Sequence, residues 1–388
     1  MVVAGEPSGD QLAAELVRAL RAEAAPFAPV FFGAGGESMA AAGVELALDL
    51  TRHAVIGIPT PGQYAKFRRF RDDLVALAAA RTPDIVVCVD FFAFNGSLAE
   101  RIRAESVRQA GIFQNWRPKL VQYVSPQVWA SRAGRAKRLE STHDLLLSIL
   151  PFEAAWYAQR APGLRVAFVG HPLVERHAKE KASEPSDSKS EGGVAPENSP
   201  PPELLLLPGS RAGELRRHLP GMLQAAKRIE AETGAKLRMV LPQESLLEQT
   251  RPLLADLPRL GVQVGGLRDA LTKATVALAS TGTVTLECAW FGVPTVALYK
   301  TSPLTYAIGK RIVTVKFLAM PNLLANEAVM PEFIQHEATP ENLANAVIAL
   351  LKDAPRRAAV RGRLASVVAS LGTPGASHRA AHAILSLA

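Results

Sequence analysis

The sequence predicts an α/β protein made of two doubly wound halves. Three observations support this fold class. Short apolar runs alternate with longer amphipathic runs from the first residues onward. A polar segment at 176–203 interrupts the alternation, and the same rhythm then resumes. Strands that alternate with helices in this way are typical of a parallel sheet with helices on both faces.

The first half begins with an expected strand at 1–5 and a helix at 9–24. Leu12, Leu16 and Leu20 of this helix recur at helical spacing. A plausible helix-ending glycine, Gly43, closes the next short helix. The further elements expected in this half are a strand at 30–36, a helix at 37–43, a helix and a buried strand over 71–90, and strands at 119–126 and 143–151.

A connector and a second half follow. Residues 176–203 are rich in Pro, Ser, Gly, Glu and Lys, and this composition favours a flexible, solvated linker. The sequence therefore predicts domains at 1–175 and 204–365, and a tail at 366–388 helical enough to cross back to the first domain. The elements expected in the second half are a strand and turn at 203–211, a helix from Glu214, strands at 236–242, 262–266 and 274–280, a helix at 283–292 and a strand at 294–300.

The composition indicates a well-packed basic protein. Of the 388 residues 48% are apolar and 21% are charged, so a large core is available. The net charge of +8 suits a polyanion, an anionic membrane or a phosphorylated ligand, without choosing among them. Cys88 and Cys288 lie in apolar runs, so we expect buried thiols in a reducing compartment. No metal-ligand spacing occurs, and neither a metal nor a cofactor is expected.

Any contact with a membrane is expected to be peripheral. No signal-peptide pattern opens the chain, and no apolar window reaches the ~18 residues of a membrane span. Because a strand begins at once, a few natural N-terminal residues are expected to be missing.

Two basic segments, 54–74 and 123–140, suit either anionic lipid or solvent. The second is expected to place Arg132, Arg135 and Arg138, with Lys137, on one helix. Nucleic acid is not expected, because aromatic residues are sparse.

Small-residue turns follow three of the expected strands. Such turns let a ligand approach the backbone, and free N–H groups at a helix start attract phosphate. The alternative for each is simple helix capping. Two turns in one half, one ending in an arginine, favour phosphate binding. Neither GxGxxG nor a Walker motif is present. The turn residues are Gly5, Ser8, Gly9 and Asp10; Gly209, Ser210 and Arg211; and Ser280, Thr281, Gly282 and Thr283.

One aspartate ends a buried strand. Asp90 closes "DIVVCVD", and its apolar neighbours would raise its pKa and make it a usable base. A capping or ion-paired aspartate remains an equal alternative. Glu287, one turn after Thr283, could accept a hydrogen bond from a ribose hydroxyl or be a solvated helix residue. A structural role is favoured for His171.

Six motifs in order resemble the lipid-A-disaccharide synthase family: "VAGEPSGD", "YVSPQVWA", "FVGHPL", "LLPGSR", "STGTVTLECAWFGVPTVALY" and "PNLLANEAVMPEFIQ". The similarity covers nearly the whole chain apart from the linker. It implies a B-type glycosyltransferase fold, in which two Rossmann-like domains face a central cleft. The C-terminal domain would bind UDP and the N-terminal domain the acceptor lipid. The rivals are another B-type UDP-sugar glycosyltransferase or epimerase, and a non-catalytic basic membrane-binding module.

The resemblance also implies a reaction and its place. The donor would be UDP-2,3-diacylglucosamine and the acceptor 2,3-diacylglucosamine 1-phosphate. The products would be a β-1′,6-linked disaccharide and UDP, with inversion at the anomeric carbon. The enzyme would be a peripheral protein on the cytoplasmic face of the inner membrane. Its oligomeric state is left open, with a homodimer as one alternative.

Individual roles follow from the same resemblance. Asp90 matches the catalytic base, Arg211 would neutralise the diphosphate and Glu287 would hold the ribose. Ala93 stands where the family usually has a second acidic residue, which leaves acceptor details and acyl-chain choice open. The positions expected to contact substrate are Ser8, Gly9, Asp10, Asn95, Gly209, Ser210, Ser280, Thr281, Gly282, Thr283, Glu287, Asn322 and Gln335.

Overall fold

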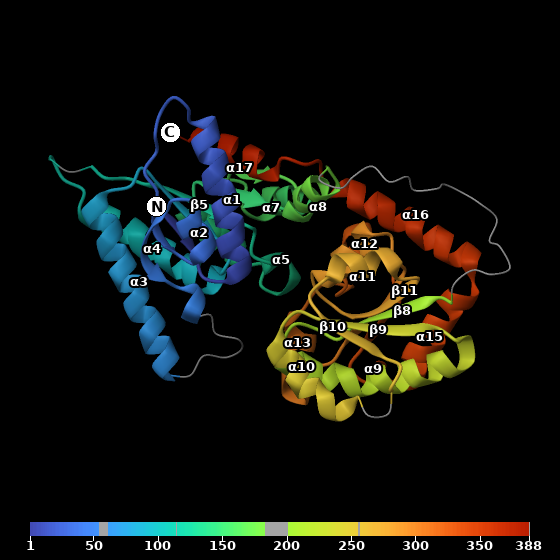
Figure 1. Cartoon of the computed structure of the whole chain (residues 1–388). Helices are drawn as coiled ribbons and strands as arrows, with labels where there is room; N and C mark the ends of the chain where they lie inside the picture. Colours follow the sequence, from blue (N-terminus) through green and yellow to red (C-terminus); the bar gives the residue numbers. More distant parts are fainter. Residues whose placement is uncertain (54–60, 114, 183–200, 255–256, 388) are drawn as a thin grey trace. The chain divides into compact units, whose positions relative to one another are not determined.

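The computed structural model describes residues 1–53, 61–113, 115–182, 201–254 and 257–387. The chain divides into two compact units (Figure 1). The first unit comprises Met1–Ser183 and Leu371–Ala388, and the second comprises Glu184–Ser370. Each unit contains one wholly parallel sheet.

The first unit holds a seven-stranded sheet in the order β3-β2-β1-β4-β5-β6-β7. The direction of winding reverses between β1 and β4, and ligands of such sheets bind at the carboxyl ends of the two strands on either side of the reversal. The strands are β1 (Val2–Ala4), β2 (Phe32–Gly35), β3 (Glu45–Asp49), β4 (Ile85–Val89), β5 (Lys119–Tyr123), β6 (Leu145–Ser148) and β7 (Val166–Phe168).

Helices cover both faces of this sheet. Side chains of β1 and β4 alternate between two apolar cores, one shared with the first helix and the other with the fourth. The helices are α1 (Pro7–Glu23), α2 (Glu37–Ala41), η1 (Thr51–His53), α3 (Pro61–Arg81), α4 (Phe92–Arg108), α5 (Val128–Ser131), α6 (Arg135–Thr142), α7 (Glu153–Arg160), α8 (Pro172–Ala182) and, from the C-terminus, α17 (Ala376–Leu385).

The C-terminal helix completes the first unit. Figure 1 shows α17 beside α1, and Ala380 and Ile384 are buried in the core that α1 shares with the sheet. Polar contacts also fix it. His378 Nδ1 lies 3.0 Å from Glu23 Oε1, and Arg379 Nε donates to Val169 O at 2.8 Å. Because α17 covers apolar side chains of α1 and the sheet, it is part of this unit's core.

The second unit repeats the architecture with six strands, in the order β10-β9-β8-β11-β12-β13. Its winding reverses between β8 and β11, which places a second ligand-binding position at their carboxyl ends. The strands are β8 (Glu203–Leu207), β9 (Lys236–Leu241), β10 (Gly261–Val264), β11 (Val276–Ser280), β12 (Thr295–Tyr299) and β13 (Glu332–Ile334).

Helices again lie on both faces. α9 and α15 share one apolar core with the sheet, and α12 and α16 share the other. The helices of this unit are α9 (Ala212–Thr233), α10 (Glu244–Thr250), η2 (Arg251–Leu253), α11 (Leu267–Lys273), α12 (Val284–Trp290), α13 (Pro303–Ile312), α14 (Met320–Ala325), α15 (Pro340–Lys352) and α16 (Ala354–Ser370).

Two details of the sequence prediction need correction. The connector was expected from residue 176, but α8 continues to Ala182, and residues 183–200 lie outside the described ranges. The basic residues expected on one helix do not share one: Arg135, Lys137 and Arg138 lie on α6, and Arg132 follows α5. Arg132, with φ −143°, ends α5, and Gly134 precedes α6. Arg138 of α6 pairs with Glu100, so this guanidinium is not a free surface cation.

Other expectations are confirmed. Both cysteines are buried and free, and Gly43 has the positive φ of +80° expected of a glycine that ends a helix. His171 has a structural role, since its Nδ1 accepts from Leu173 N at 3.1 Å and burial lowers its pKa to about 4. Within the described ranges, no helix is both long and apolar enough to cross a membrane.

Candidate active site

The ends of β1 and β4 meet closely in the first unit. A Cβ added at Gly5 would lie 2.1 Å from Cδ1 of Phe91, so only glycine fits there. A Cβ at Gly9 would lie 3.8 Å from Cβ of Asp90. The first turn of α1 therefore borders the aspartate directly. Ser8 is exposed in this turn and Gly9 is buried.

Asp90 occupies a strained strand end. Its φ is +49° and that of Phe91 is +44°, both in the left-handed region that side chains other than those of Asn and Asp rarely adopt. The turn is held from two sides. Asp90 N donates to Tyr123 O at 2.8 Å, and Asp90 O accepts from Asn95 Nδ2 at 2.9 Å and from Gln122 Nε2 at 3.3 Å. Strain of this kind persists only where neighbours enforce it, as they do at functional sites.

Asn95 supports this turn from inside the protein. It is fully buried, and its Nδ2 also donates to Val89 O at 3.2 Å. The expected substrate contact is corrected to a positioning role, because the amide nitrogen is used by backbone carbonyls. Gln122 has a similar role that sequence reasoning missed. Its polar side chain within the buried strand β5 was the available signal. Ala93 is exposed in the first turn of α4.

Burial changes the acidity of Asp90. Desolvation raises the pKa of its carboxyl above the ordinary value of 3.8, and the hydrogen bond from the Phe91 N–H offsets part of that rise. The direction agrees with the prediction from the apolar flanks. Asp90 as a whole is half-buried and thus not fully enclosed. A carboxylate with a raised pKa and an open face can act as a general base.

This pKa shift predicts the acid limit of the activity. If Asp90 is a catalytic base, as the sequence predicts, it must be ionised, and kcat/KM should fall as the pH drops through a value above 3.8. We would measure kcat/KM against pH and record the melting temperature at each pH. Burial lowers the pKa of His143 to about 4, so the unfolded chain binds a proton there more readily and the folded state loses stability as the pH falls from 6.5 toward 4. An acid limit that coincides with unfolding at every pH would contradict the assignment to Asp90.

Asp10 has a structural role instead of the expected substrate contact. It is buried, and its carboxylate accepts from three backbone N–H groups at the start of α2: Gly36 at 2.7 Å, Ser38 at 2.9 Å and Met39 at 3.2 Å. These groups have no partner within their own helix. The side chain therefore joins α1 to α2 and fixes the turn that borders Asp90.

A buried polar cluster supports the "SPQVWA" segment. Trp129 Nε1 donates to Glu153 Oε1 at 2.9 Å, and Leu150 N donates to Glu153 Oε2 at 3.1 Å. Ser125 Oγ lies 3.1 Å from the Tyr157 hydroxyl oxygen. Burial raises the pKa of Glu153 to about 7. The cluster fixes the loops at the carboxyl ends of β5 and β6, one strand along from Asp90, and sequence reasoning missed Glu153 and Tyr157.

In the second unit the two predicted phosphate turns lie together. β8 and β11 are neighbours, and a Cβ added at Gly209 would lie 3.5 Å from Ser280 Oγ and 2.7 Å from Glu214 Oε2. Gly209 has φ +123°, which glycine tolerates and other residues do not. Arg211 directly precedes the first turn of α9, so the turn presents backbone N–H groups and a guanidinium together.

Arg211 is available to an anion. Its side chain is 62% exposed, and its Nη1 lies 3.0 Å from Glu214 Oε1. Glu214 Oε2 also accepts from Ser210 N at 3.3 Å. Exposed ion pairs of this kind contribute little stability, about 0–1 kcal/mol. The guanidinium can therefore turn to a diphosphate at small cost, with the positive end of the α9 dipole beside it.

The second turn exposes its tip. Ser280 is buried, whereas Gly282 and Thr283 are exposed, and Thr281 is half-buried. Thr285 Oγ1 donates to Gly282 O at 2.7 Å, which fixes the loop ahead of α12. The half-buried Glu287 follows in the first turn of that helix. The structure thus places the turn residues predicted in the second half at one edge of the second sheet.

A histidine joins this edge to the next strand. His218 is buried on α9, with Nδ1 2.9 Å from Pro208 O, and its Nε2 accepts from Lys300 N at 3.0 Å. Burial lowers its pKa, so the ring is neutral, with the proton on Nδ1. The phosphate turn is therefore tied to the end of β12. The position of His218, two helical turns after Arg211, was the signal that sequence reasoning missed.

Two amides expected to face the nucleotide sugar bond to the protein. Gln335 Oε1 accepts from Thr301 N and its Nε2 donates to Thr301 O, both at 3.0 Å. Asn322 is fully buried; its Nδ2 donates to Met330 O and to Glu332 Oε1, and its Oδ1 accepts from Met330 N, each at 2.7 Å. Asn322 therefore has a positioning role, because it is fully buried and both of its N–H groups are used. Gln335 is half-buried and keeps one N–H, so its expected substrate contact stays a prediction.

The Asn322 network predicts a large stability effect. Asn322→Ala removes three hydrogen bonds and leaves buried partners unpaired, at about 1–3 kcal/mol for each orphaned group. We expect the free energy of unfolding, measured by denaturant titration, to fall by at least about 3 kcal/mol. Asn115→Ala, at an exposed asparagine, is the matched control. Equal stability of the two variants would contradict the positioning role.

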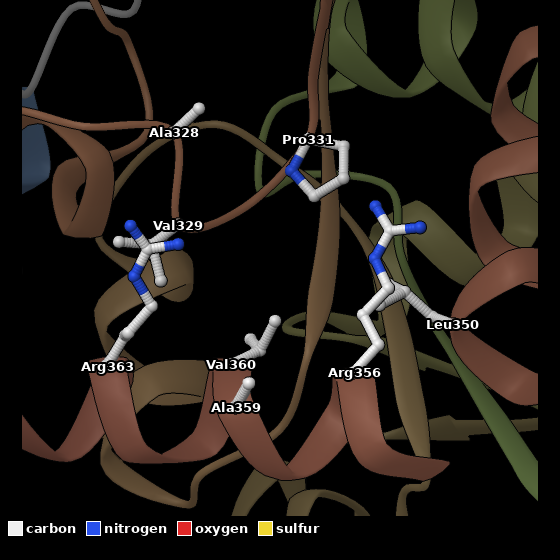
Figure 2. Close-up of a pocket in the computed structure, with 8 residues that line it drawn as sticks. All are labelled: Ala328, Val329, Pro331, Leu350, Arg356, Ala359, Val360 and Arg363. Atoms are coloured by element: carbon white, nitrogen blue, oxygen red, sulfur yellow. The ribbon is translucent and has the colours of Figure 1, made fainter. Parts of the chain in front are cut away.

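A separate pocket of about 320 Å³ lies in the second unit. Figure 2 shows Arg356 and Arg363 of α16 beside Val329 and Pro331. These last two residues precede β13, so the pocket lies toward the amino ends of the strands. The phosphate turns lie at the carboxyl ends, and this pocket is therefore not part of the candidate site.

The fold and both reversal points define the class of protein. Two Rossmann-like units, one with a strand-end carboxylate and the other with an arginine at a strand-end turn, have the fold of the B-type glycosyltransferases. Solved structures of similar fold include MurG from Acinetobacter baumannii (TM-score 0.55, 15% identity, 100% of this chain and 98% of that chain). Another is UDP-GlcNAc 2-epimerase from Neisseria meningitidis (TM-score 0.54, 10% identity, 99% and 97%).

The sequence comparisons identify the family. The family model described as lipid-A-disaccharide synthetase matches residues 1–385. Lipid-A-disaccharide synthases of Myxococcus xanthus and Geobacter metallireducens are each 36% identical to this chain, over all of it and over 97% and 96% of their own lengths. The chain belongs to the lipid-A-disaccharide synthetase family and is a glycosyltransferase that acts on a UDP-sugar and a lipid acceptor.

Proposed function

We propose that this chain transfers 2,3-diacylglucosamine from UDP to the 6-hydroxyl of 2,3-diacylglucosamine 1-phosphate. The products are the β-1′,6-linked disaccharide 1-phosphate and UDP. Family membership supports the reaction. The observation that carries the residue assignment is the half-buried Asp90 at the strained end of β4, beside the reversal of the sheet.

The proposed chemistry is a single in-line displacement. The Asp90 carboxylate accepts the proton of the 6-hydroxyl as that oxygen forms a bond to the anomeric carbon. The bond from this carbon to the UDP oxygen breaks, and UDP leaves with the electron pair. Attack opposite the leaving group gives inversion. General bases of this kind contribute about 10²–10⁴-fold to the rate.

Stabilisation of the leaving group is assigned to the second unit. Arg211 and the N–H groups around Ser210 would bind the diphosphate, and those ahead of Thr283 would assist. Glu287 is proposed to hold the ribose. Ser8 and Gly9 are proposed to line the site beside Asp90. In this proposal the positive charge of Arg211 and the backbone N–H groups neutralise the diphosphate, which is a task that a bound metal ion performs in other enzymes.

Membrane association of the first unit is also proposed. The start of α3 exposes Tyr64 at 67%, and Lys66, Arg68 and Arg69 are exposed after it. Apolar and basic groups together suit the surface of an anionic bilayer. We propose peripheral binding at the cytoplasmic face of the inner membrane, where both acylated substrates would lie. The rest of this basic segment, 54–60, lies outside the described residues.

An assay with purified protein, both lipid substrates and detergent tests the proposal. We expect disaccharide 1-phosphate and UDP in equal amounts, and the same rate after addition of EDTA. A product from UDP-GlcNAc alone would instead support an epimerase or another glycosyltransferase. Loss of activity with EDTA and its return with a divalent cation would overturn the assignment of charge neutralisation to Arg211 and the backbone N–H groups.

A further inference from the structure

The helix that follows β12 leaves its apolar side chains uncovered. α13 spans Pro303–Ile312, and none of its residues is buried. Leu304 is 72% exposed and Ile308 is 51% exposed. These two residues are four apart and lie on the same face of the helix. A surface helix normally packs such a face against its own core, and no part of the chain that the structure describes buries this one.

The charged residues of the chain segment that contains α13 have one sign. No aspartate or glutamate occurs between Glu287 and Glu327, whereas the same stretch contains Lys300, Lys310, Arg311 and Lys316. Lys310 and Arg311 are exposed in the last turn of the helix. An uncovered apolar face beside exposed cations is the pattern of a helix that lies in the interface of an anionic membrane. The charge is complementary to that of anionic phospholipid headgroups.

The position of α13 is fixed at the edge that carries the phosphate turns. Lys300 N donates to His218 Nε2, and Thr301 is paired through its backbone with the Gln335 amide. Ser302 Oγ then caps the helix by accepting from Thr305 N at 3.1 Å. Because β12 is the neighbour of β11, α13 begins at the carboxyl edge of the sheet that also carries Ser280.

We propose that α13 is an interfacial helix of the second unit that inserts Leu304 and Ile308 into an anionic phospholipid surface. This inference rests on the proposed function, since a donor whose acyl chains lie in a bilayer presents its UDP group at the bilayer surface. If α13 holds the carboxyl edge of the second sheet at that surface, the turns at this edge can bind the UDP group while the acyl chains of the donor stay in the bilayer. The surface is separate from the start of α3, which belongs to the other unit.

Vesicle co-flotation of the full chain tests the inference. The vesicles contain phosphatidylglycerol with phosphatidylcholine, or phosphatidylcholine alone. We expect the double variant Leu304→Ser/Ile308→Ser to bind phosphatidylglycerol vesicles at least about tenfold more weakly than the unchanged chain, because two apolar anchors are lost. The matched control is Ile112→Ser/Phe113→Ser, which alters two side chains that are 97% and 99% exposed elsewhere. The control is expected to bind as the unchanged chain does.

Further readouts separate this inference from the proposed function. UDP affinity and disaccharide synthesis in detergent should be unchanged in the α13 variant, while synthesis from substrates in vesicles should fall. Unchanged vesicle binding by that variant, in a chain that is active in detergent, would overturn the inference alone. A change of oligomeric state without a change in vesicle binding would also overturn it, and would point to a second copy. No synthesis in detergent by the unchanged chain would refute the proposed function.

Discussion

Asp90→Asn is expected to lower kcat by about 10²–10⁴-fold, because the amide cannot accept the proton of the attacking hydroxyl. The substitution keeps the shape of the side chain, and asparagine tolerates the positive φ of +49° at this position. It also removes a carboxylate whose burial disfavours its charge. We therefore expect a folded protein with a melting temperature at or above that of the unchanged chain.

Control variants make the Asp90 result specific. Asp84 is exposed just before the other end of the same strand, so Asp84→Asn should leave kcat unchanged. UDP affinity, measured by calorimetry, should be the same in both variants, because the nucleotide contacts are assigned to the second unit. Normal turnover by Asp90→Asn would exclude Asp90 as the base. It would also favour the non-catalytic alternative if no activity depended on any residue of this turn.

The strand ends were predictable from the sequence, because buried parallel strands are short apolar runs that stop at polar or small residues. This pattern located Asp90, Gly209 and Ser280 correctly at the carboxyl edges. The edge strands β3, β7, β10 and β13 are only partly buried, so their runs carry a weaker signal, although a strand was predicted at β10. β3 and β13 were not predicted.

Which polar residues face inward could not be predicted. Asn95 and Asn322 sit in the expected motifs, but whether an amide meets a ligand or a backbone carbonyl depends on how distant segments pack. Asp10 shows the same limit, since its partners lie on a different helix. The family motifs therefore located the neighbourhood of each site. Burial and hydrogen bonding distinguished its positioning residues from those that remain accessible.

Because Arg211 is also accessible, Arg211→Ala is expected to cause the second large effect, a loss of UDP affinity. The guanidinium is 62% exposed and lies beside the N-terminus of α9, where no core packing depends on it. Charge-assisted hydrogen bonds to a diphosphate contribute about 1.5–3 kcal/mol each. We expect UDP affinity, measured by calorimetry, to fall by about 10- to 150-fold, which is that free energy expressed as a ratio. The rate should fall at least as much, since negative charge grows on UDP as it leaves.

Two further variants test whether Arg211 raises UDP affinity through its positive charge or through bidentate hydrogen bonds from its guanidinium. Arg211→Lys keeps the charge but loses bidentate geometry, so its UDP affinity should lie between those of Arg211→Ala and the unchanged chain. Arg228→Ala removes an exposed arginine near the opposite end of α9, where it pairs with Glu232, and should bind UDP normally. If all three variants bound UDP equally well, the diphosphate would have to be held by the backbone turns alone, and the catalytic assignment of Arg211 would fail.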